Sequence, residues 1–234
     1  MPVKVSENWK IAGPEEVPIN RVTSVWQDLS AGREVDAEAL KLYNGAVRKT
    51  VVQIAQNTTS PERSLSTILT TEGPATLRVE ANNVRGMNFV EEVVPADFIR
   101  VKRGFESNTE IKGVGAALMV RQGWSERDPM IPKSGLWYPL TGLLDLDQPM
   151  SPVLRLYDPT DDGEIVKSGR VFPLSVDYTA TFARDFQERQ FLFKKVNALF
   201  KFEKFADNLG LYRVSAFNPE KEVCILVHGI NSSP

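Results

Sequence analysis

The one histidine of the chain, His228, follows an apolar run and precedes small polar residues. The run Val223–Val227 predicts a strand buried on both faces, because it lacks the polar alternation of a half-exposed strand. Serine and histidine are residues of nucleophilic catalysis, and Ser232 and Ser233 closely follow His228. These serines lie in a predicted loop with no base beside them. We therefore expect them to line a site entrance or to cap a following helix, and not to act as nucleophiles.

The stretch GLYRVSAFNPEKEVCILVHGINSSP, residues 210–234, resembles the start of the catalytic domain of α/β-hydrolase-fold lipases and esterases. In that family an antiparallel strand pair leads to a buried strand that ends in His-Gly. The resemblance implies that Ile230 donates its backbone N–H to an oxyanion hole, where preorganised donors stabilise the charge that develops during ester hydrolysis. The motif residues with a structural role at the site would be His228, Gly229, Asn231, Ser232 and Ser233.

The stretch LYDPTDDGEIVKSGRVFPLSVDYTATFARDF, residues 156–186, also resembles a bacterial subgroup of these hydrolases, in which a β-rich region precedes the core. The resemblance then covers roughly residues 151–234. It implies the N-terminal portion of a bacterial serine hydrolase, truncated after the His-Gly oxyanion strand. The chain departs from the family because it has no Gly-x-Ser-x-Gly nucleophile elbow, and the family's triad lies downstream of that strand. We therefore expect a chain that is inactive alone and whose partner is a missing C-terminal catalytic domain.

The same resemblance implies carboxylic esters or lipids as substrates, and neither a metal nor an organic cofactor. Members of the subgroup are often exported or lipid-anchored, so it also implies a periplasmic or outer-membrane location. A cytoplasmic location stays open, because MPVKVSENWK at the N-terminus has no apolar segment typical of a signal peptide.

A second interpretation is a non-catalytic β-sandwich module that binds a partner in the bacterial envelope. In this case the tail strand would complete the module's own sheet. The two interpretations differ in what covers Val223–Val227: a downstream domain in the enzyme, or the region 179–209 in the module.

Acidic residues offer a weaker candidate, a calcium loop. They are Asp158, Asp161, Asp162 and Glu164. Counted from Asp158, Gly169 stands at the twelfth position, where an EF-hand loop requires a glutamate. We therefore interpret the segment as an acidic turn, and Asp161-Asp162-Gly163 is suitable for a hairpin.

Two further groups have a chemical and a structural interpretation. Asp145 and Asp147 alternate on a predicted strand, so they are either paired carboxylates or, as we expect, solvent-facing positions. Trp124, Trp137 and Tyr138 flank a proline-containing loop and could stack on a ligand ring, although core packing is the default for such side chains.

The composition is that of an ordinary globular protein: of 234 residues, 42% are hydrophobic and 25% are charged, and the formal net charge is -2. This length accommodates one large or two small domains. We see no basic stripe typical of nucleic-acid binding, and no apolar run outside the tail approaches the roughly 20 residues of a membrane helix. We expect neither nucleic-acid binding nor a transmembrane helix. The lone Cys224 cannot form an internal disulfide, and we interpret it as a small buried side chain.

The elements that would position these residues begin with a polar, proline-containing segment, residues 1–35, which predicts an extended arm held by Trp9 and Trp26. Residues 36–57 predict a helix with Asp36 as N-cap. Its apolar positions recur every three or four residues and are Leu40, Tyr43, Val47, Val51 and Ile54.

The fold class that follows is α+β, in four parts. Residues 1–72 form an N-terminal helical arm, and residues 73–178, where the apolar period changes to two, form an antiparallel β-sandwich-like unit. Residues 179–210 predict connecting helices. Residues 211–234 predict the first strands of an α/β-hydrolase sheet.

Overall fold

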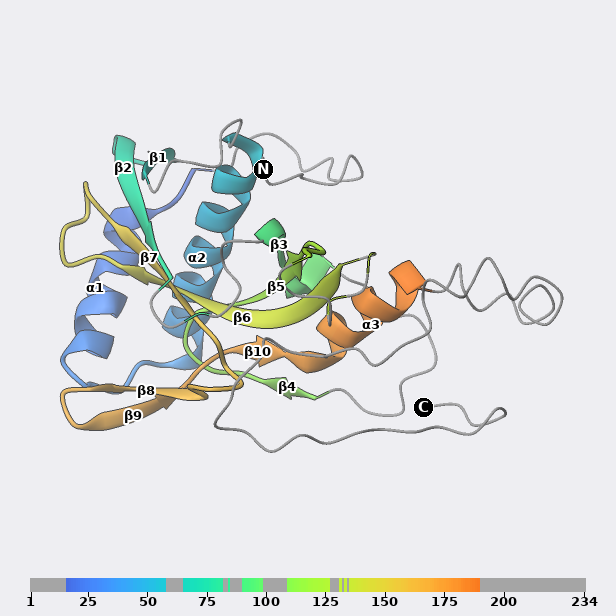
Figure 1. The fold of residues 1–234 in the computed structure, drawn as a ribbon. Helices are drawn as coiled ribbons and strands as arrows, with labels where there is room; N and C mark the ends of the chain where they lie inside the picture. The colour runs from blue at the N-terminus through green and yellow to red at the C-terminus, as the bar shows by residue number, and fades with distance from the viewer. Residues whose placement is uncertain are drawn as a thin grey trace, which may run out of the picture.

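The computed structural model describes residues 16–57, 65–81, 84, 90–98, 109–126, 131, 133 and 135–189. Over these residues the fold is α+β, as the sequence predicts, with helices against a mostly antiparallel sheet (Figure 1). The helices are α1 (Ile19–Ser30), α2 (Ala37–Asn57), α3 (Tyr178–Arg189) and the 3-10 turn η2 (Ala96–Phe98). The largest sheet contains β1 (Leu65–Thr70), β2 (Gly73–Glu80), β3 (Val90–Pro95), β5 (Ala116–Gln122), β6 (Leu136–Asp145) and β7 (Val153–Tyr157).

Two strand pairs lie outside this sheet: β4 (Glu110–Ile111) with β10 (Val176–Asp177), and β8 (Glu164–Lys167) with β9 (Arg170–Pro173). The strand order of the large sheet is β1-β2-β7-β6-β5-β3, and its neighbours are antiparallel except β2 and β7. Strand β7 therefore returns beside β2 after the chain has built the other half of the sheet.

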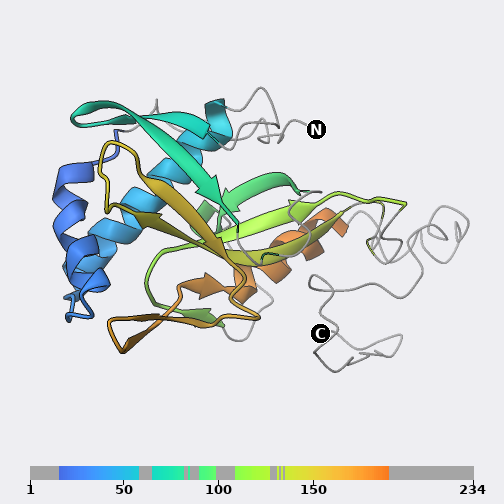
Figure 2. The ribbon, with the colours of Figure 1, turned by 60° about the vertical axis from the view of Figure 1, so that its left-hand side comes forward.

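The sheet curls around α2. This helix packs against both edge strands, β1 and β3, as well as against β5 and β6 between them (Figures 1 and 2). Its buried side includes Tyr43, Val47 and Val51, which lie in the main hydrophobic core. The helical stripe predicted from the sequence is thus confirmed. The cap is confirmed too, because Asp36 Oδ1 accepts a hydrogen bond of 2.7 Å from the backbone N–H of Ala39.

The extended arm predicted for residues 1–35 is wrong over residues 19–30, which form α1. Val22, Val25, Trp26 and Leu29 recur at helical spacing and all are buried in the core that α1 shares with α2. Trp26 does hold the segment in place: its Nε1 donates to Asp147 Oδ1 at 2.8 Å, and it stacks on the ring of Tyr43.

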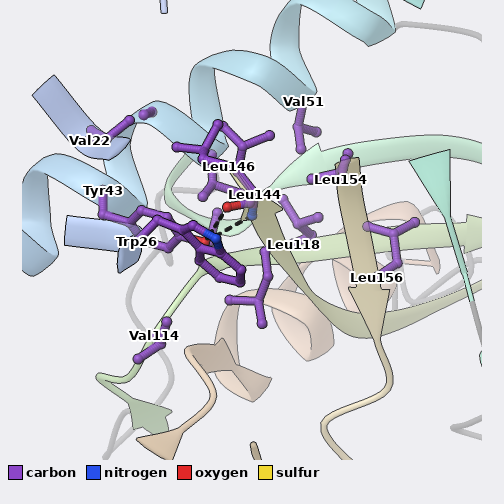
Figure 3. Packing of buried hydrophobic residues seen from close by; sticks show 14 of the residues in the cluster. Val22, Trp26, Tyr43, Val51, Val114, Leu118, Leu144, Leu146, Leu154 and Leu156 are labelled. Atoms are coloured by element: carbon purple, nitrogen blue, oxygen red, sulfur yellow. Dashed lines mark hydrogen bonds between the residues drawn. The ribbon is translucent and has the colours of Figure 1, made fainter. Parts of the chain in front are cut away.

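Three polar side chains of α2 bind the backbone around the sheet, each at two points. The Tyr43 hydroxyl bonds the N–H and C=O of Leu144 (Figure 3), and the Gln53 amide bonds the N–H and C=O of Leu69 on the edge strand β1. The amide of Asn44 donates to the carbonyl of Gly113 and accepts from the N–H of Gly115. These contacts fix the position of the helix along the strands, which apolar packing alone does not specify.

The opposite face of β5 and β6 carries a second, smaller core. Successive strand residues point to opposite faces, so Met119 and Trp137 face away from α2. They are buried together with Val94 and with Ala180 of α3. Helix α3 therefore covers the face of the sheet that α2 leaves open.

The finer parts of the predicted architecture have different outcomes. A sandwich-like arrangement is not confirmed, because helices pack on the faces of the six-stranded sheet. The predicted boundary at residue 72 falls inside the turn between the paired strands β1 and β2. The predicted hydrolase strands, residues 211–234, lie outside the described residues. Among the residues that the structure describes, no helix is both long enough and apolar enough to span a membrane.

Candidate functional site

The predicted oxyanion motif lies outside the part of the chain that the structure describes. This applies to every residue proposed for it: His228, Gly229, Ile230, Asn231, Ser232 and Ser233. Among the described residues, the candidate functional groups are two clusters of charged side chains and one exposed tryptophan.

The first cluster forms at a β-bulge between β3 and β5. The register of the two strands shifts between Val90 and Glu92, so Glu91 is an extra residue on β3. Glu92 lies opposite Arg121 and is 7% exposed. Glu91 accepts a hydrogen bond from Arg121, with Nη1 and Oε2 3.0 Å apart. The bulge thus gathers two carboxylates beside one guanidinium.

Two further side chains extend this cluster across β6 to α3. Trp137 is the register partner of Arg121, and the guanidinium of Arg184 lies 5.0 Å from the centre of the Trp137 ring. We call Glu91, Glu92, Arg121, Trp137 and Arg184 the bulge cluster. The Glu91 carboxylate already has a cationic partner, so this arrangement is suited to holding strands and helix together, not to proton transfer.

Sequence reasoning missed the bulge cluster, although VEEVVP contains a signal. Glu91 and Glu92 are consecutive, and in a regular strand consecutive side chains point to opposite faces. One carboxylate would then face the core that contains Val93. In the bulged strand Glu91 is instead 33% exposed and pairs with Arg121, so two adjacent acidic residues in an apolar strand are a signal for a bulge.

The second cluster lies on β2, β6 and β7. Arg155 donates to Asp145 Oδ2 at 3.2 Å and also to Glu80, and Glu80 pairs with Arg78 at 3.0 Å. Burial raises the pKa of the neighbouring Tyr157, while Arg155 lowers it. Each carboxylate of this cluster has an arginine partner. We therefore interpret the cluster as a network of ion pairs that stabilises the sheet.

Asp145 and Asp147, the two carboxylates considered as a pair, bind different partners in the structure. Asp145 binds Arg155, whereas Asp147 accepts from Trp26. The side chain of Asp145 is only 12% exposed, so the expectation that it faces solvent is wrong. Asp147 is exposed, as expected.

The acidic segment after β7 forms a turn held by its own side chains. Asp158 Oδ1 accepts from both the N–H and the hydroxyl of Thr160. No group of three or more metal-binding side chains occurs within the described ranges. The hairpin turn predicted at residues 161–163 is wrong, because this segment joins β7 to β8, which are in different sheets. The hairpin turns instead at Ser168-Gly169, where both φ angles are positive (47° and 79°).

The aromatic residues that could stack on a ligand do not act as a group. Trp137 and Tyr138 are 2% and 1% exposed, so they belong to the two cores. Burial raises the pKa of Tyr138, and the nearby Asp158 raises it further. Trp124, in contrast, is 44% exposed just beyond the end of β5. Of the three, only Trp124 is exposed.

Comparisons with known proteins add no relative. No family model matches the chain, no curated protein matches it, and no solved structure matches it. A functional assignment therefore depends on the residues and geometry of this chain.

Proposed function

We propose that the chain is the N-terminal accessory region and the oxyanion strand of a bacterial serine hydrolase that acts on carboxylic esters or lipids. One observation carries the proposal: the apolar run Val223–Val227 leads directly into His228-Gly229 and then Ile230. A buried strand that ends in His-Gly can present the next backbone N–H at the rim of a dry site, where an oxyanion would form.

The chemical roles are divided between two parts. The chain supplies the N–H of Ile230, and residues 211–234 contribute the first strands of an α/β-hydrolase sheet. A C-terminal catalytic domain supplies the serine nucleophile, the histidine base and the acidic residue that orients it. The pairing of charged side chains supports an accessory role for the described residues. Glu80, Glu91 and Asp145 are each paired with an arginine, so these carboxylates are suited to holding the structure together and not to proton transfer.

The proposed location is the cell envelope, after export. An accessory region of this kind would shape access to the site or hold the enzyme near an ester-rich surface. Fractionation of the source bacterium tests this, and recovery of the native protein in the cytosolic fraction would contradict it.

The experiment for the oxyanion role compares two substitutions at one position in the native hydrolase. Ile230→Pro removes the backbone N–H, so kcat for a short-chain nitrophenyl ester falls by about 10²–10³-fold. Ile230→Ala keeps the N–H and stays within roughly threefold of the unsubstituted protein. Equal kcat values for Ile230→Pro and Ile230→Ala would contradict the role of Ile230 as an oxyanion-hole donor. Circular dichroism spectra verify that both variants are folded.

A non-catalytic interaction module is the second candidate function. It is favoured by a pair of exposed apolar side chains on the β8–β9 hairpin, Val166 and Val171, which lie opposite each other and are 65% and 51% exposed. A native protein that carries no serine reactive toward a fluorophosphonate would favour this module over the hydrolase.

A further inference from the structure

Helix α2 contains the one Asn-Gly pair of the sequence, Asn44-Gly45. In such a pair the backbone nitrogen of the glycine can attack the side-chain carbonyl carbon of the asparagine. Glycine favours this attack because it has no side chain to hinder the approach and because its backbone reaches conformations that other residues avoid. Asn44 is therefore the position at which the sequence most favours spontaneous loss of a side-chain amide.

The folded structure holds the Asn44 amide away from this reaction. Its Nδ2 donates to the carbonyl of Gly113 at 2.9 Å, and its Oδ1 accepts from the backbone N–H of Gly115 at 2.8 Å. The side chain is thus directed at the segment before β5 and not at its own backbone. Within an α-helix the N–H of Gly45 also donates to the carbonyl four residues earlier, so the attacking nitrogen is occupied. The attack requires both sets of contacts to break.

The segment that binds Asn44 has little freedom to move. A Cβ at Gly113 would overlap the carbonyl oxygen of Pro173, because the backbone at the end of β9 lies close against it. The N–H of Val114 donates to that same carbonyl at 2.8 Å, and the C=O of Val114 accepts from the N–H of Ser175 at 3.0 Å. The segment is therefore fixed on the side opposite α2 and cannot follow a change in the Asn44 side chain.

We propose that Asn44 is a modification site, at which the chain loses ammonia only while α2 is separated from the segment before β5. The Gly45 nitrogen bonds to the side-chain carbonyl carbon of Asn44, and the bond from this carbon to the amide nitrogen breaks. The amide nitrogen leaves as ammonia with the proton that the Gly45 nitrogen gives up. Water then opens the resulting succinimide at either carbonyl and gives aspartate or isoaspartate at position 44. The inference goes beyond the proposed function and does not depend on it.

Both products prevent the original contacts from forming again. A carboxylate has no hydrogen to donate, so the buried carbonyl of Gly113 would face a second acceptor in place of the Nδ2 donor. Isoaspartate also adds a carbon to the backbone in the middle of a helix, which disrupts the regular hydrogen bonds of the helix. The modification therefore makes the opening of α2 irreversible.

Peptide mapping of the full chain by mass spectrometry, after incubation at mildly alkaline pH, tests the dependence on opening. We expect Asn44 to be converted at least about a hundredfold more slowly in the native protein than in urea, because only opened molecules react. Equal rates in the two conditions, or no conversion in urea, would overturn the proposal.

A variant that loosens α2 provides a second test. Tyr43→Phe keeps Asn44 and Gly45 but removes the hydroxyl contacts with Leu144, so conversion in the native protein should speed up by at least about tenfold. Tyr157→Phe is the matched control and should change the rate by less than about fivefold. Each native rate is divided by the rate of the same variant in urea, which cancels any effect of the substitution on the chemistry itself. A ratio that Tyr43→Phe leaves unchanged also overturns the proposal.

The consequence of the modification is tested with Asn44→Asp, which installs one of the products directly. The equilibrium constant for unfolding should rise by about tenfold to a hundredfold, because the Gly113 carbonyl loses its donor. Asn20→Asp makes the same charge change at an exposed asparagine of α1 and should alter this constant by less than about threefold. Urea denaturation that gives Asn44→Asp the stability of the unsubstituted chain would contradict the irreversibility.

Discussion

The hydroxyl of Tyr43 bonds both backbone groups of Leu144: it donates to the carbonyl at 2.8 Å and accepts from the N–H at 3.0 Å (Figure 3). Strand β5 begins at Ala116, whose register partner on β6 is Gly142. Leu144 therefore lies beyond the last pair with β5, and the helix hydroxyl takes the place of the missing strand neighbour. In this way α2 completes the sheet that curls around it.

Removal of the Tyr43 hydroxyl should lower the free energy of unfolding more than the loss of a single oxygen atom usually does. Tyr43→Phe leaves the N–H and C=O of Leu144 buried without these bonds, so the free energy of unfolding should fall by about 2–3 kcal/mol. Urea denaturation measures the loss. The control is Tyr157→Phe, on a half-buried tyrosine, which should cost less than about 1 kcal/mol. Equal losses in the two variants would contradict a special contribution of the Tyr43 hydroxyl to stability.

The buried tyrosines also predict instability in alkali. Burial raises the pKa of Tyr43 above its ordinary value of 10.0, and it raises the pKa of Tyr138 in the same direction. Above pH 10 the unfolded chain releases protons that the folded chain keeps, so stability is fully present below pH 10 and falls as the pH rises. Each tyrosine contributes a slope of about 1.4 kcal/mol per pH unit.

Urea denaturation between pH 9 and pH 11.5 would measure this slope. In Tyr43→Phe the slope should be smaller by about 1.4 kcal/mol per pH unit. A slope that does not change in this variant would contradict the burial of the Tyr43 hydroxyl.

The ion network on β2, β6 and β7 should contribute more than a surface ion pair. Arg155→Leu leaves the mostly buried Asp145 carboxylate without the guanidinium that it binds, which should cost about 1–2 kcal/mol of unfolding free energy. Arg33→Leu is the matched control, because the Arg33 and Asp28 side chains are 63% and 43% exposed and the loss should stay below about 1 kcal/mol. Denaturation at pH 7 that gives equal losses would refute a special role for Arg155.

Two glycines should respond to alanine in opposite directions. Gly45 lies within α2 with open space around its missing Cβ, so Gly45→Ala should stabilise the protein by about 0.5–1 kcal/mol. Gly115 has a φ of +93°, and a Cβ there would lie 2.4 Å from the carbonyl oxygen of Gly142. Gly115→Ala should therefore cost about 2–5 kcal/mol. Thermal melting distinguishes the two, and a stabilising Gly115→Ala would contradict the described strand contact.

The sequence predicts the elements whose signals are local. Helix α2 is found because its period and the Asp36 cap both lie in one short stretch of sequence. The strand-rich character of residues 73–178 is found because the apolar period there changes to two, and β2, β5, β6 and β7 all lie in this range. Helix α1 is missed because its polar face and the preceding Pro18 suggest an arm. In the structure Pro18 lies at the helix start, where a residue without an N–H loses no bond.

The rest depends on contacts between distant residues. The parallel pairing of β2 with β7, and the burial of Asp145 beside Arg155, follow from how the sheet closes and have no local signal. The bulge at Glu91 is different, since the adjacent glutamates do indicate it. The predicted motif around Ile230 lies outside the described residues, so its role stays a prediction.

The measurement that tests the hydrolase assignment most directly is labelling of the native protein from its source organism with a fluorophosphonate, followed by intact mass and peptide mapping. We expect a protein clearly larger than the 26.2 kDa of this chain, labelled at one serine in a Gly-x-Ser-x-Gly segment that follows residue 234. A native protein of about 26.2 kDa that carries no label would contradict it.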